Sequence, residues 1–251
     1  MNRKHVQLNQ RTWDKVAGSY YGHSALPHWG PYEIGSPAKD LIGPIRGKTF
    51  LELGCGSGHS LRYLLRKGAR HVSGVDFSKT QIAYAAELNR KALTDQRVTL
   101  WQKPMEAPLP LKNIDVAFSI FALGWSTNIP LTLKCVYRYL KPNGAFVMSW
   151  EHPAFRHIDF VHHRYSPVSP YWQDDFRTKR WKGKFTMIAQ FPTIASWHHL
   201  LTTAGFRILR ILEPRPRRFP AHLRDRTRHY ANAKAKLVPP MIIFDCRKNT
   251  R

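Results

Sequence analysis

The chain has 251 residues, 43% of them hydrophobic, which suits one α/β core with a covering segment and is short for two full domains. Lysine and arginine number 40 against 16 acidic residues, a net charge of +24 that attracts polyanions such as RNA but identifies neither fold nor chemistry. The polar N-terminus has no signal-peptide core, the longest apolar run (116–125) is too short to cross a bilayer, and the three cysteines show neither metal-ligand nor disulfide spacing, so we expect a cytoplasmic protein without a membrane span or metal site.

The first 47 residues are rich in aromatic residues, proline and glycine, and they precede any regular alternation of strand and helix patterns. Loops of this length are usually functional or disordered, and the aromatic content argues against disorder. We interpret this segment as a cover over the carboxyl ends of the strands, where ligands bind in α/β sheets.

From residue 48 onward strand and helix patterns alternate, which favours a layered α/β fold with a mostly parallel sheet. The seventh and last of the predicted strands lies close to the C-terminus. In chain order the predicted strands cover residues 49–53, 71–75, 98–101, 114–123, 145–150, 206–212 and 241–245.

Helices are predicted between these strands from the spacing of apolar residues and from end signals. The helix after the first strand ends at Gly68, and the helix after the second begins at Ser78, which forms a capping-box pattern with Gln81. Before the fifth strand the helical spacing of apolar residues runs to Leu140, followed by Pro142. A further helix is expected over residues 197–204, and residues 153–192 form a second aromatic and basic stretch that we interpret as a lid.

Residues 51–58 read Leu-Glu-Leu-Gly-Cys-Gly-Ser-Gly and connect the first strand to its helix. Glycines let the backbone turn sharply and approach a ligand, and the start of a helix offers free N–H groups. Asp76 follows at the end of the second strand, where a carboxylate can accept hydrogen bonds from two ribose hydroxyls. This combination predicts an adenosine-type ligand across the strand ends.

The spacing of the glycines narrows the choice of ligand. The dinucleotide fingerprint G-x-G-x-x-G would place a glycine at position 59, which is His59, and no Gly-Lys-Ser/Thr sequence follows as in a P-loop. Glu52 precedes the glycines and is a better neighbour for a cation than for a pyrophosphate. A purely structural tight turn is the alternative interpretation, which the surrounding strand–helix–strand pattern disfavours.

At this point the chain resembles the class I S-adenosylmethionine-dependent methyltransferases, especially those with a UbiE-like, type 11 catalytic domain. The resemblance spans about residues 13–248 and rests on four segments in order: 51–58, Gly-Val-Asp-Phe-Ser at 74–78, 114–123, and Leu-Lys-Pro-Asn-Gly at 140–144. It implies a Rossmann-like, doubly wound sheet of seven mostly parallel strands, with a lid formed by the N-terminal segment and an insertion after strand five. The implied cofactor is S-adenosylmethionine.

The resemblance also implies how one domain is organised over residues 1–251. The N-terminal cover would take residues 1–47, the cofactor-binding core 48–152, the lid insertion 153–192 and the C-terminal half of the sheet 193–251. Within the cover, the stretch from Trp13 resembles the helix at the start of that family's domain, so Tyr20 would close over the cofactor.

In the glycine-rich turn, the resemblance implies that Gly54, Gly56 and Gly58 contact the methionyl part of the cofactor, with Cys55 between them. Glu52 would organise the amino end of the cofactor.

Five further residues would hold the nucleoside part. Asp76 would bind the ribose and Phe77 would pack on the adenine. Met105 and Glu106 would lie at the adenine edge, and Phe121 would sit beside the cofactor at the end of strand four. The sequence departs from the family after strand three, where it reads Gln-Lys-Pro-Met in place of a common acidic residue.

Methyl transfer needs the acceptor atom held close to the methyl carbon and sometimes a base for its proton. His152, in Ser-Trp-Glu-His-Pro after strand five, is the candidate base, because an unperturbed histidine suits neutral pH. Alternatively, His152 fixes the turn into the lid together with Pro153. His28 and the adjacent pair His162 and His163 are weaker candidates.

The acceptor is expected to be a small molecule methylated on O, N or C, in a pocket lined by aromatic residues of the cover. The candidates for this lining are Trp29, Tyr32, Trp125, Tyr171, Trp172 and Trp181. An RNA methyltransferase that uses the arginine-rich stretch 215–228 is the alternative. A non-catalytic cofactor- or RNA-binding protein is a third possibility.

Overall fold

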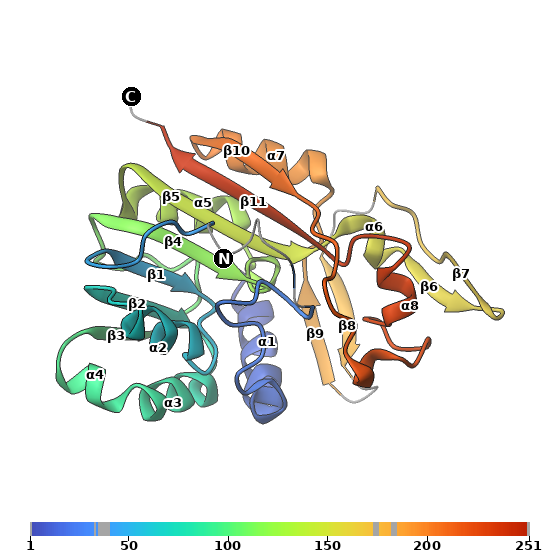
Figure 1. Cartoon of the computed structure of the whole chain (residues 1–251), viewed down its shortest axis with the longest axis horizontal. Helices are drawn as coiled ribbons and strands as arrows, with labels where there is room; N and C mark the ends of the chain where they lie inside the picture. Colours follow the sequence, from blue (N-terminus) through green and yellow to red (C-terminus); the bar gives the residue numbers. More distant parts are fainter. Residues whose placement is uncertain (1, 33, 35–40, 173–175, 182–184, 250–251) are drawn as a thin grey trace.

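The computed structural model describes residues 2–32, 34, 41–172, 176–181 and 185–249 (Figure 1). Its centre is a seven-stranded sheet in the order β10-β11-β5-β4-β1-β2-β3. The strands are β1 (Thr49–Leu53), β2 (His71–Asp76), β3 (Val98–Gln102), β4 (Ile114–Ile120), β5 (Leu140–Glu151), β10 (Phe206–Leu212) and β11 (Met241–Lys248).

Strands β1 to β5 pair in parallel, and β11 pairs antiparallel with both β5 and β10. The chain runs outward from β1 through β2 to β3 and then returns to β4 and β5 on the other side of β1. The strand order therefore reverses between β1 and β4, the point where open α/β sheets bind ligands. The predicted fold, a doubly wound and mostly parallel seven-stranded sheet, is confirmed.

Helices cover both faces of the sheet, so its central strands are buried on both sides. On one face Leu51 packs in a cluster with Leu133 and Trp197, and on the other Phe50 packs with Leu61. The α-helices are α1 (Arg3–Val16), α2 (His59–Arg66), α3 (Lys79–Leu88), α4 (Arg90–Thr94), α5 (Ile129–Tyr139), α6 (Pro153–Arg156), α7 (Ile194–Thr203) and α8 (Asn232–Ala235). None of the helices in the described part of the chain is long and apolar enough to cross a membrane.

Two predicted helix ends are confirmed, whereas one predicted helix end and one predicted strand end need correction. Gly68 follows α2 with φ +88°, and the Ser78 hydroxyl accepts a hydrogen bond from the Gln81 N–H at 3.1 Å. The helix before β5, predicted to run to Leu140, ends one residue earlier because Leu140 is extended and pairs with Ile114 of β4. Strand β4 ends at Ile120 rather than at residue 123, because Phe121 turns the chain with φ +50°.

The N-terminal segment and the insertion after β5 pack against each other beside the carboxyl ends of the strands (Figure 1). The insertion contains the hairpins β6–β7 (Ile158–Val161, Arg164–Pro167) and β8–β9 (Arg177–Trp181, Phe185–Ala189). The Asn9 side chain donates to the Ile188 carbonyl at 2.7 Å and accepts from the Ile188 N–H at 2.8 Å, which fixes α1 along β9. These two parts of the chain, far apart in sequence, thus form one cover.

Candidate functional site

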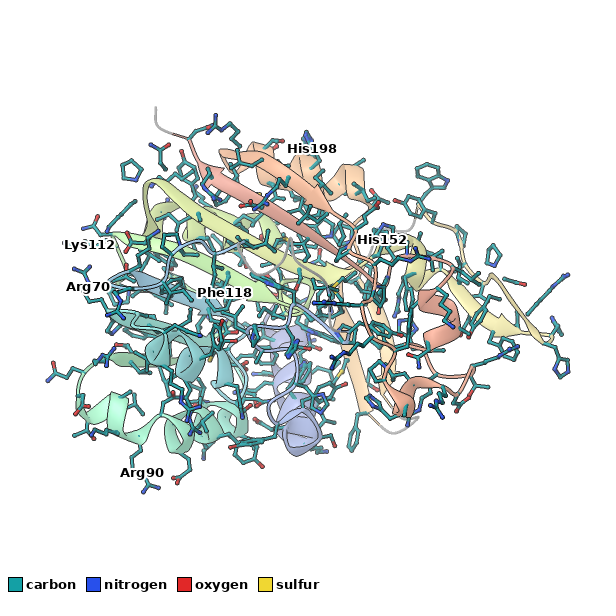
Figure 2. All side chains as sticks on the ribbon, in the orientation of Figure 1. Arg70, Arg90, Lys112, Phe118, His152 and His198 are labelled. Carbon is teal, nitrogen blue, oxygen red and sulfur yellow. The ribbon has the colours of Figure 1, made fainter. Side chains whose placement is uncertain are left out.

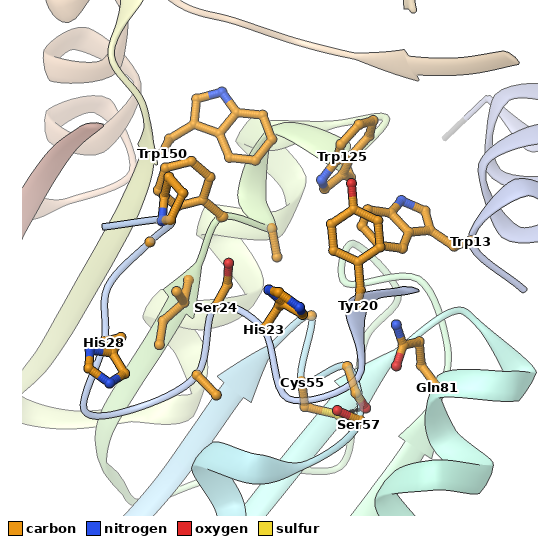
Figure 3. A pocket seen from close by; sticks show the side chains of 18 of the residues that line it. Trp13, Tyr20, His23, Ser24, His28, Cys55, Ser57, Gln81, Trp125 and Trp150 are labelled. Atoms are coloured by element: carbon orange, nitrogen blue, oxygen red, sulfur yellow. Dashed lines mark hydrogen bonds between the residues drawn. The ribbon is translucent and has the colours of Figure 1, made fainter. Parts of the chain in front are cut away.

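A cavity of about 510 Å³ lies at the carboxyl ends of β1, β2, β4 and β5, beneath the cover (Figure 3). One side is formed by the glycine-rich turn after β1 and by the end of β2. The opposite side is formed by the ends of β4 and β5 and by side chains of the cover.

The three glycines of the turn all have positive φ angles, but they are required for different reasons. A Cβ atom on Gly54 would lie 2.2 Å from the Ala122 Cβ, and one on Gly58 would lie 2.9 Å from the Ala85 Cβ. A Cβ on Gly56 would meet nothing nearer than the Gln81 Oε1 at 3.8 Å. Gly54 and Gly58 therefore permit close packing of the protein on itself, whereas Gly56 leaves its space to the cavity.

Asp76 joins the turn to the start of α3. Its Oδ2 accepts from the Gly56 N–H at 3.0 Å, and its Oδ1 accepts from the Ser78 N–H at 2.9 Å. Burial raises the pKa of Asp76 to about 6, while these two hydrogen bonds act in the opposite direction. A carboxylate has about four acceptor positions, so Asp76, which lines the cavity, retains capacity for a ligand's hydroxyl groups.

Helix α1 holds the loop that follows Asp76. The Asp14 Oδ1 accepts from the Ser78 hydroxyl at 2.6 Å and from the Thr80 N–H at 3.0 Å. The Gln10 side chain donates to the Phe77 carbonyl at 2.8 Å. Hydrogen bonds from α1 therefore connect the cover to the loop that follows Asp76.

Aromatic side chains close the cavity from above the turn. Trp13 packs against Tyr20 and Trp125, with ring centroids 5.0 Å and 5.4 Å apart, and Trp125 meets Trp150 at 5.9 Å (Figure 3). The predicted cofactor residues that line the cavity are Tyr20, Gly54, Cys55, Gly56, Asp76, Phe77, Met105 and Phe121.

Three predicted cofactor residues are not among those that line this cavity. Glu52 is buried within β1, and burial raises the pKa of its carboxyl well above the ordinary value. Gly58 is the N-cap residue of α2, and a Cβ there would clash with Ala85 of α3. Glu106 accepts hydrogen bonds from the Thr127 N–H and hydroxyl and from the Ser126 hydroxyl. Their contact with a cofactor remains a prediction, and their surroundings show structural roles.

His152, the predicted base, also lies outside the cavity lining. Its Nε2 is 2.7 Å from the Glu213 Oε1, and its Nδ1 accepts from the Ala154 N–H at 3.1 Å. The side chain thus caps α6 at the turn into the insertion. This position matches the alternative interpretation, in which His152 fixes the turn with Pro153.

The neighbouring residue, Glu151, lines the cavity instead and is only 3% exposed. Its Oε2 is 2.6 Å from both the Tyr230 hydroxyl, which donates to it, and the His229 Nε2. The Arg156 Nη1 lies 3.8 Å from the Oε1. Burial and the nearby Glu151 raise the pKa of Tyr230 well above its ordinary value, so Tyr230 stays a hydrogen-bond donor.

Glu151 was not predicted from the sequence, because the adjacent His152 was the more obvious candidate for a base at neutral pH. The signal was present: an acidic residue closes a long buried strand at the edge where ligands bind. Its partners could not have been linked to it from the sequence, because they lie far along the chain. His229 follows Glu151 by 78 positions and Tyr230 follows it by 79.

The predicted aromatic lining is correct in part. Tyr32 and Trp125 line the cavity, whereas Trp29 packs on Phe118 in the core, with ring centroids 6.3 Å apart. Tyr171 does not line it, and Trp172 is 82% exposed. The side chain of Trp181 lies outside the described residues. Aromatic lining residues that were not predicted for this role are Trp13, Trp150, Phe191 and Tyr230.

The charge of the cavity differs from that of the whole chain. Among the described residues that line it there is no lysine or arginine, and its carboxylates are those of Asp76 and Glu151. The basic residues lie elsewhere; Figure 2 shows Arg70, Arg90 and Lys112 at the end of the molecule away from the insertion. In the described part of the chain no group of acidic, histidine and cysteine residues is arranged to hold a metal ion.

Residues 51–148 match the family model described as a methyltransferase domain. An uncharacterised protein of Haemophilus influenzae is 35% identical over 116 residues, covering 45% of this chain and 46% of that protein. An S-adenosyl-L-methionine-dependent Diels-Alderase of Talaromyces variabilis is 29% identical over 139 residues, covering 51% and 47%. The chain thus spans about half the length of these curated relatives.

Solved structures extend the likeness across the described fold. The crystal structure of a putative S-adenosylmethionine-dependent methyltransferase from Listeria monocytogenes is 26% identical, with a TM-score of 0.69, and the match covers 84% of this chain and 95% of that one. Together with the domain match, this confirms the resemblance found in the sequence.

Proposed function

We propose that this chain, which carries a methyltransferase domain of the class I fold, binds S-adenosylmethionine in the cavity and transfers its methyl group to a small-molecule acceptor. The observation that carries the proposal is that one cavity is bordered by two different surfaces. The glycine-rich turn and Asp76 form the first, and the aromatic side chains with Glu151 form the second. A cofactor and an acceptor can therefore meet in it.

The first surface fits the cofactor of this domain family. The space beside Gly56 is open, and the Asp76 carboxylate borders it as an acceptor for ribose hydroxyls. Phe77 and Met105 offer apolar contacts for the adenine. S-adenosylmethionine supplies a methyl group activated by a sulfonium, and it carries no phosphate that would call for lysine or arginine in the lining.

The second surface fits the positioning that methyl transfer requires. Trp125, Trp150 and Phe191 offer flat apolar faces, which hold an acceptor in place and exclude water from the reacting atoms. Tyr20 and Trp13, in the N-terminal cover, lie on the cofactor side of the same opening. The protein's contribution is therefore to align the acceptor atom with the methyl carbon.

Calorimetry with the full chain tests the cofactor assignment. S-adenosylmethionine and S-adenosylhomocysteine should both bind to the wild type with one site, and NAD should not bind. Asp76→Asn should weaken binding less than Asp76→Ala, because the amide keeps one oxygen to accept from Gly56 or Ser78. Binding of NAD in preference to S-adenosylhomocysteine would overturn the assignment.

RNA is the second candidate acceptor, and a specific observation supports keeping it. The arginines at positions 215, 217, 218, 224, 226 and 228 are all exposed, and residues of the same segment, His222 and Leu223, line the cavity. A basic surface thus borders the site. The small-molecule acceptor is favoured because the described lining residues offer aromatic faces and include no lysine or arginine to bind a phosphate.

The name of one relative shows that cofactor binding alone does not establish methyl transfer, so the reaction product also has to be identified. The Talaromyces protein is an S-adenosyl-L-methionine-dependent Diels-Alderase, so a related chain is named for a different reaction. Formation of S-adenosylhomocysteine together with a methylated product therefore has to be measured. Cofactor that is bound but never demethylated would favour the third possibility, a non-catalytic binding protein.

A further inference from the structure

The acceptor side of the cavity contains one carboxylate, that of Glu151, and neighbouring side chains hold it in a fixed position. Glu151 ends β5, is 3% exposed and still lines the cavity. Burying a charged group is costly unless hydrogen bonds and opposite charges compensate. The Tyr230 hydroxyl, the His229 ring and the Arg156 guanidinium supply that compensation from α6 and from the segment before α8. A carboxylate held in this way is available to a ligand without a large rearrangement.

The surroundings of Glu151 limit the charge of its ligand. The lining contains two carboxylates and, among its described residues, no lysine or arginine, although the chain has a net charge of +24. A carboxylate or phosphate on the acceptor would meet Glu151, and the described part of the cavity wall offers histidines but no lysine or arginine to neutralise it. A neutral or cationic group that donates a hydrogen bond is instead attracted, because charge-assisted hydrogen bonds are stronger than neutral ones.

We propose that Glu151 binds an N–H or O–H group of the methyl acceptor and takes its proton, so that the acceptor is a flat, mostly apolar molecule with such a donor and without an anionic group. The flat shape follows from the faces of Trp150, Phe191 and Tyr230, which line the same side of the cavity. This inference rests on the proposed function, since it assigns the acceptor of that same site.

The step balances without another reactant. The lone pair on the acceptor nitrogen or oxygen forms the bond to the methyl carbon while the carbon–sulfur bond breaks, and its electron pair stays on sulfur as a neutral thioether. The acceptor's proton moves to the Glu151 carboxylate. From there it can leave through His229, whose Nε2 is 2.6 Å from the Glu151 Oε2 and whose side chain is 27% exposed.

The test measures the affinity of defined probes for the full chain saturated with S-adenosylhomocysteine, by ligand-observed NMR. In each of two matched pairs a methyl group replaces the donated hydrogen: indole against 1-methylindole, and 2-naphthol against 2-methoxynaphthalene. A fifth probe, 2-naphthoate, carries the anion. We expect at least one donor probe to bind about tenfold more tightly than its methylated partner, and 2-naphthoate to bind most weakly. The pair with the larger preference assigns a nitrogen or an oxygen acceptor.

Two variants locate that preference. Glu151→Gln should reduce it to about threefold or less while leaving the affinity for S-adenosylhomocysteine unchanged, which also shows that the variant is folded. Glu213→Gln removes a carboxylate that pairs with His152 outside the cavity and should leave the preference intact. Equal binding within both pairs, a preference that survives in Glu151→Gln, or tightest binding of 2-naphthoate would each overturn the inference.

The same experiment separates this inference from the proposed function. If S-adenosylhomocysteine fails to bind the wild type, the proposed function fails, and the probe preferences measured without it still decide the role of Glu151. If it binds and the preferences are absent, only the assignment of the acceptor fails.

Discussion

The cofactor side and the acceptor side of the cavity differ in the parts of the chain that form them. The cofactor side is organised around a backbone turn that needs glycine, and the Asp76 carboxylate supports this turn by accepting from the Gly56 and Ser78 N–H groups. The acceptor side is made of large side chains, which come from β5, from the segments that follow β4 and β9, and from the segment before α8. A backbone site tolerates few substitutions and suits one constant ligand, whereas a side-chain site can change with the acceptor.

The sharpest test of this comparison is a pair of glycine variants in one turn. Gly56→Val should abolish measurable cofactor binding, a loss of at least about 100-fold, because the side chain would fill the open space beside the turn. Gly58→Ala should instead lower the melting temperature and keep the affinity of the remaining folded protein, because its Cβ would lie 2.7 Å from the Asn89 Nδ2. Calorimetry and thermal unfolding distinguish the two, and unchanged affinity in a folded Gly56→Val would place the cofactor elsewhere.

Asp76 should give the next largest effect. Asp76→Ala removes an acceptor for the ribose and the two backbone bonds that shape the turn, so we expect a loss of about 10- to 100-fold in affinity for S-adenosylhomocysteine. Isothermal titration calorimetry measures this loss. An affinity within twofold of the wild type would contradict the role of Asp76.

The raised pKa of Asp76 predicts a direction for the pH dependence. The folded-state pKa of about 6 lies above the ordinary 3.8, so the free protein takes up a proton there as the pH falls through 6. A protonated carboxyl accepts hydrogen bonds less well, and affinity at pH 5 should be about tenfold lower than at pH 7. The raised pKa also means that ionised Asp76 costs stability above pH 4, a cost relieved as the pH falls through 6. Asp76→Asn should flatten both profiles.

The same comparison explains what could be predicted from the sequence. The turn at 54–58 and Asp76 follow local rules of glycine, strand end and helix start, and most of these residues do line the cavity. The same local pattern includes Glu52, Gly58 and Glu106, but these three residues contact other parts of the protein and not the cavity. Such contacts depend on the tertiary fold, so the spacing of residues in the sequence does not reveal them. The pairing of Glu151 with Tyr230 depends on how the chain returns after β10, so only the folded structure shows it.

A smaller and selective effect is expected on the acceptor side. Tyr230→Phe removes the hydroxyl that donates to Glu151 and should slow methyl transfer by about tenfold, since the carboxylate loses a partner that orients it. The affinity for S-adenosylhomocysteine should stay within twofold, because Tyr230 lies on the other side of the cavity. The rate of labelled product formation from a small-molecule extract provides the readout, and a parallel loss of cofactor affinity would contradict the division into two sides.

The smallest effect is expected from the basic surface. The triple variant Arg215→Ala, Arg217→Ala and Arg218→Ala removes exposed charge near the cavity and should leave small-molecule methylation unchanged. Methylation of RNA, if that is the acceptor, would fall in the variant, and its steep dependence on salt would flatten as phosphate contacts are lost. Rates measured between low and high salt in both proteins decide between these outcomes.

The most direct test follows the methyl group itself. The full chain is incubated with S-adenosylmethionine labelled in its methyl group and, separately, with the small-molecule and RNA fractions of a cell lysate. We predict labelled product in the small-molecule fraction, with S-adenosylhomocysteine formed in equal amount and neither formed by Gly56→Val. Label recovered in RNA, or cofactor that binds but is never demethylated in either fraction, would contradict a small-molecule methyltransferase.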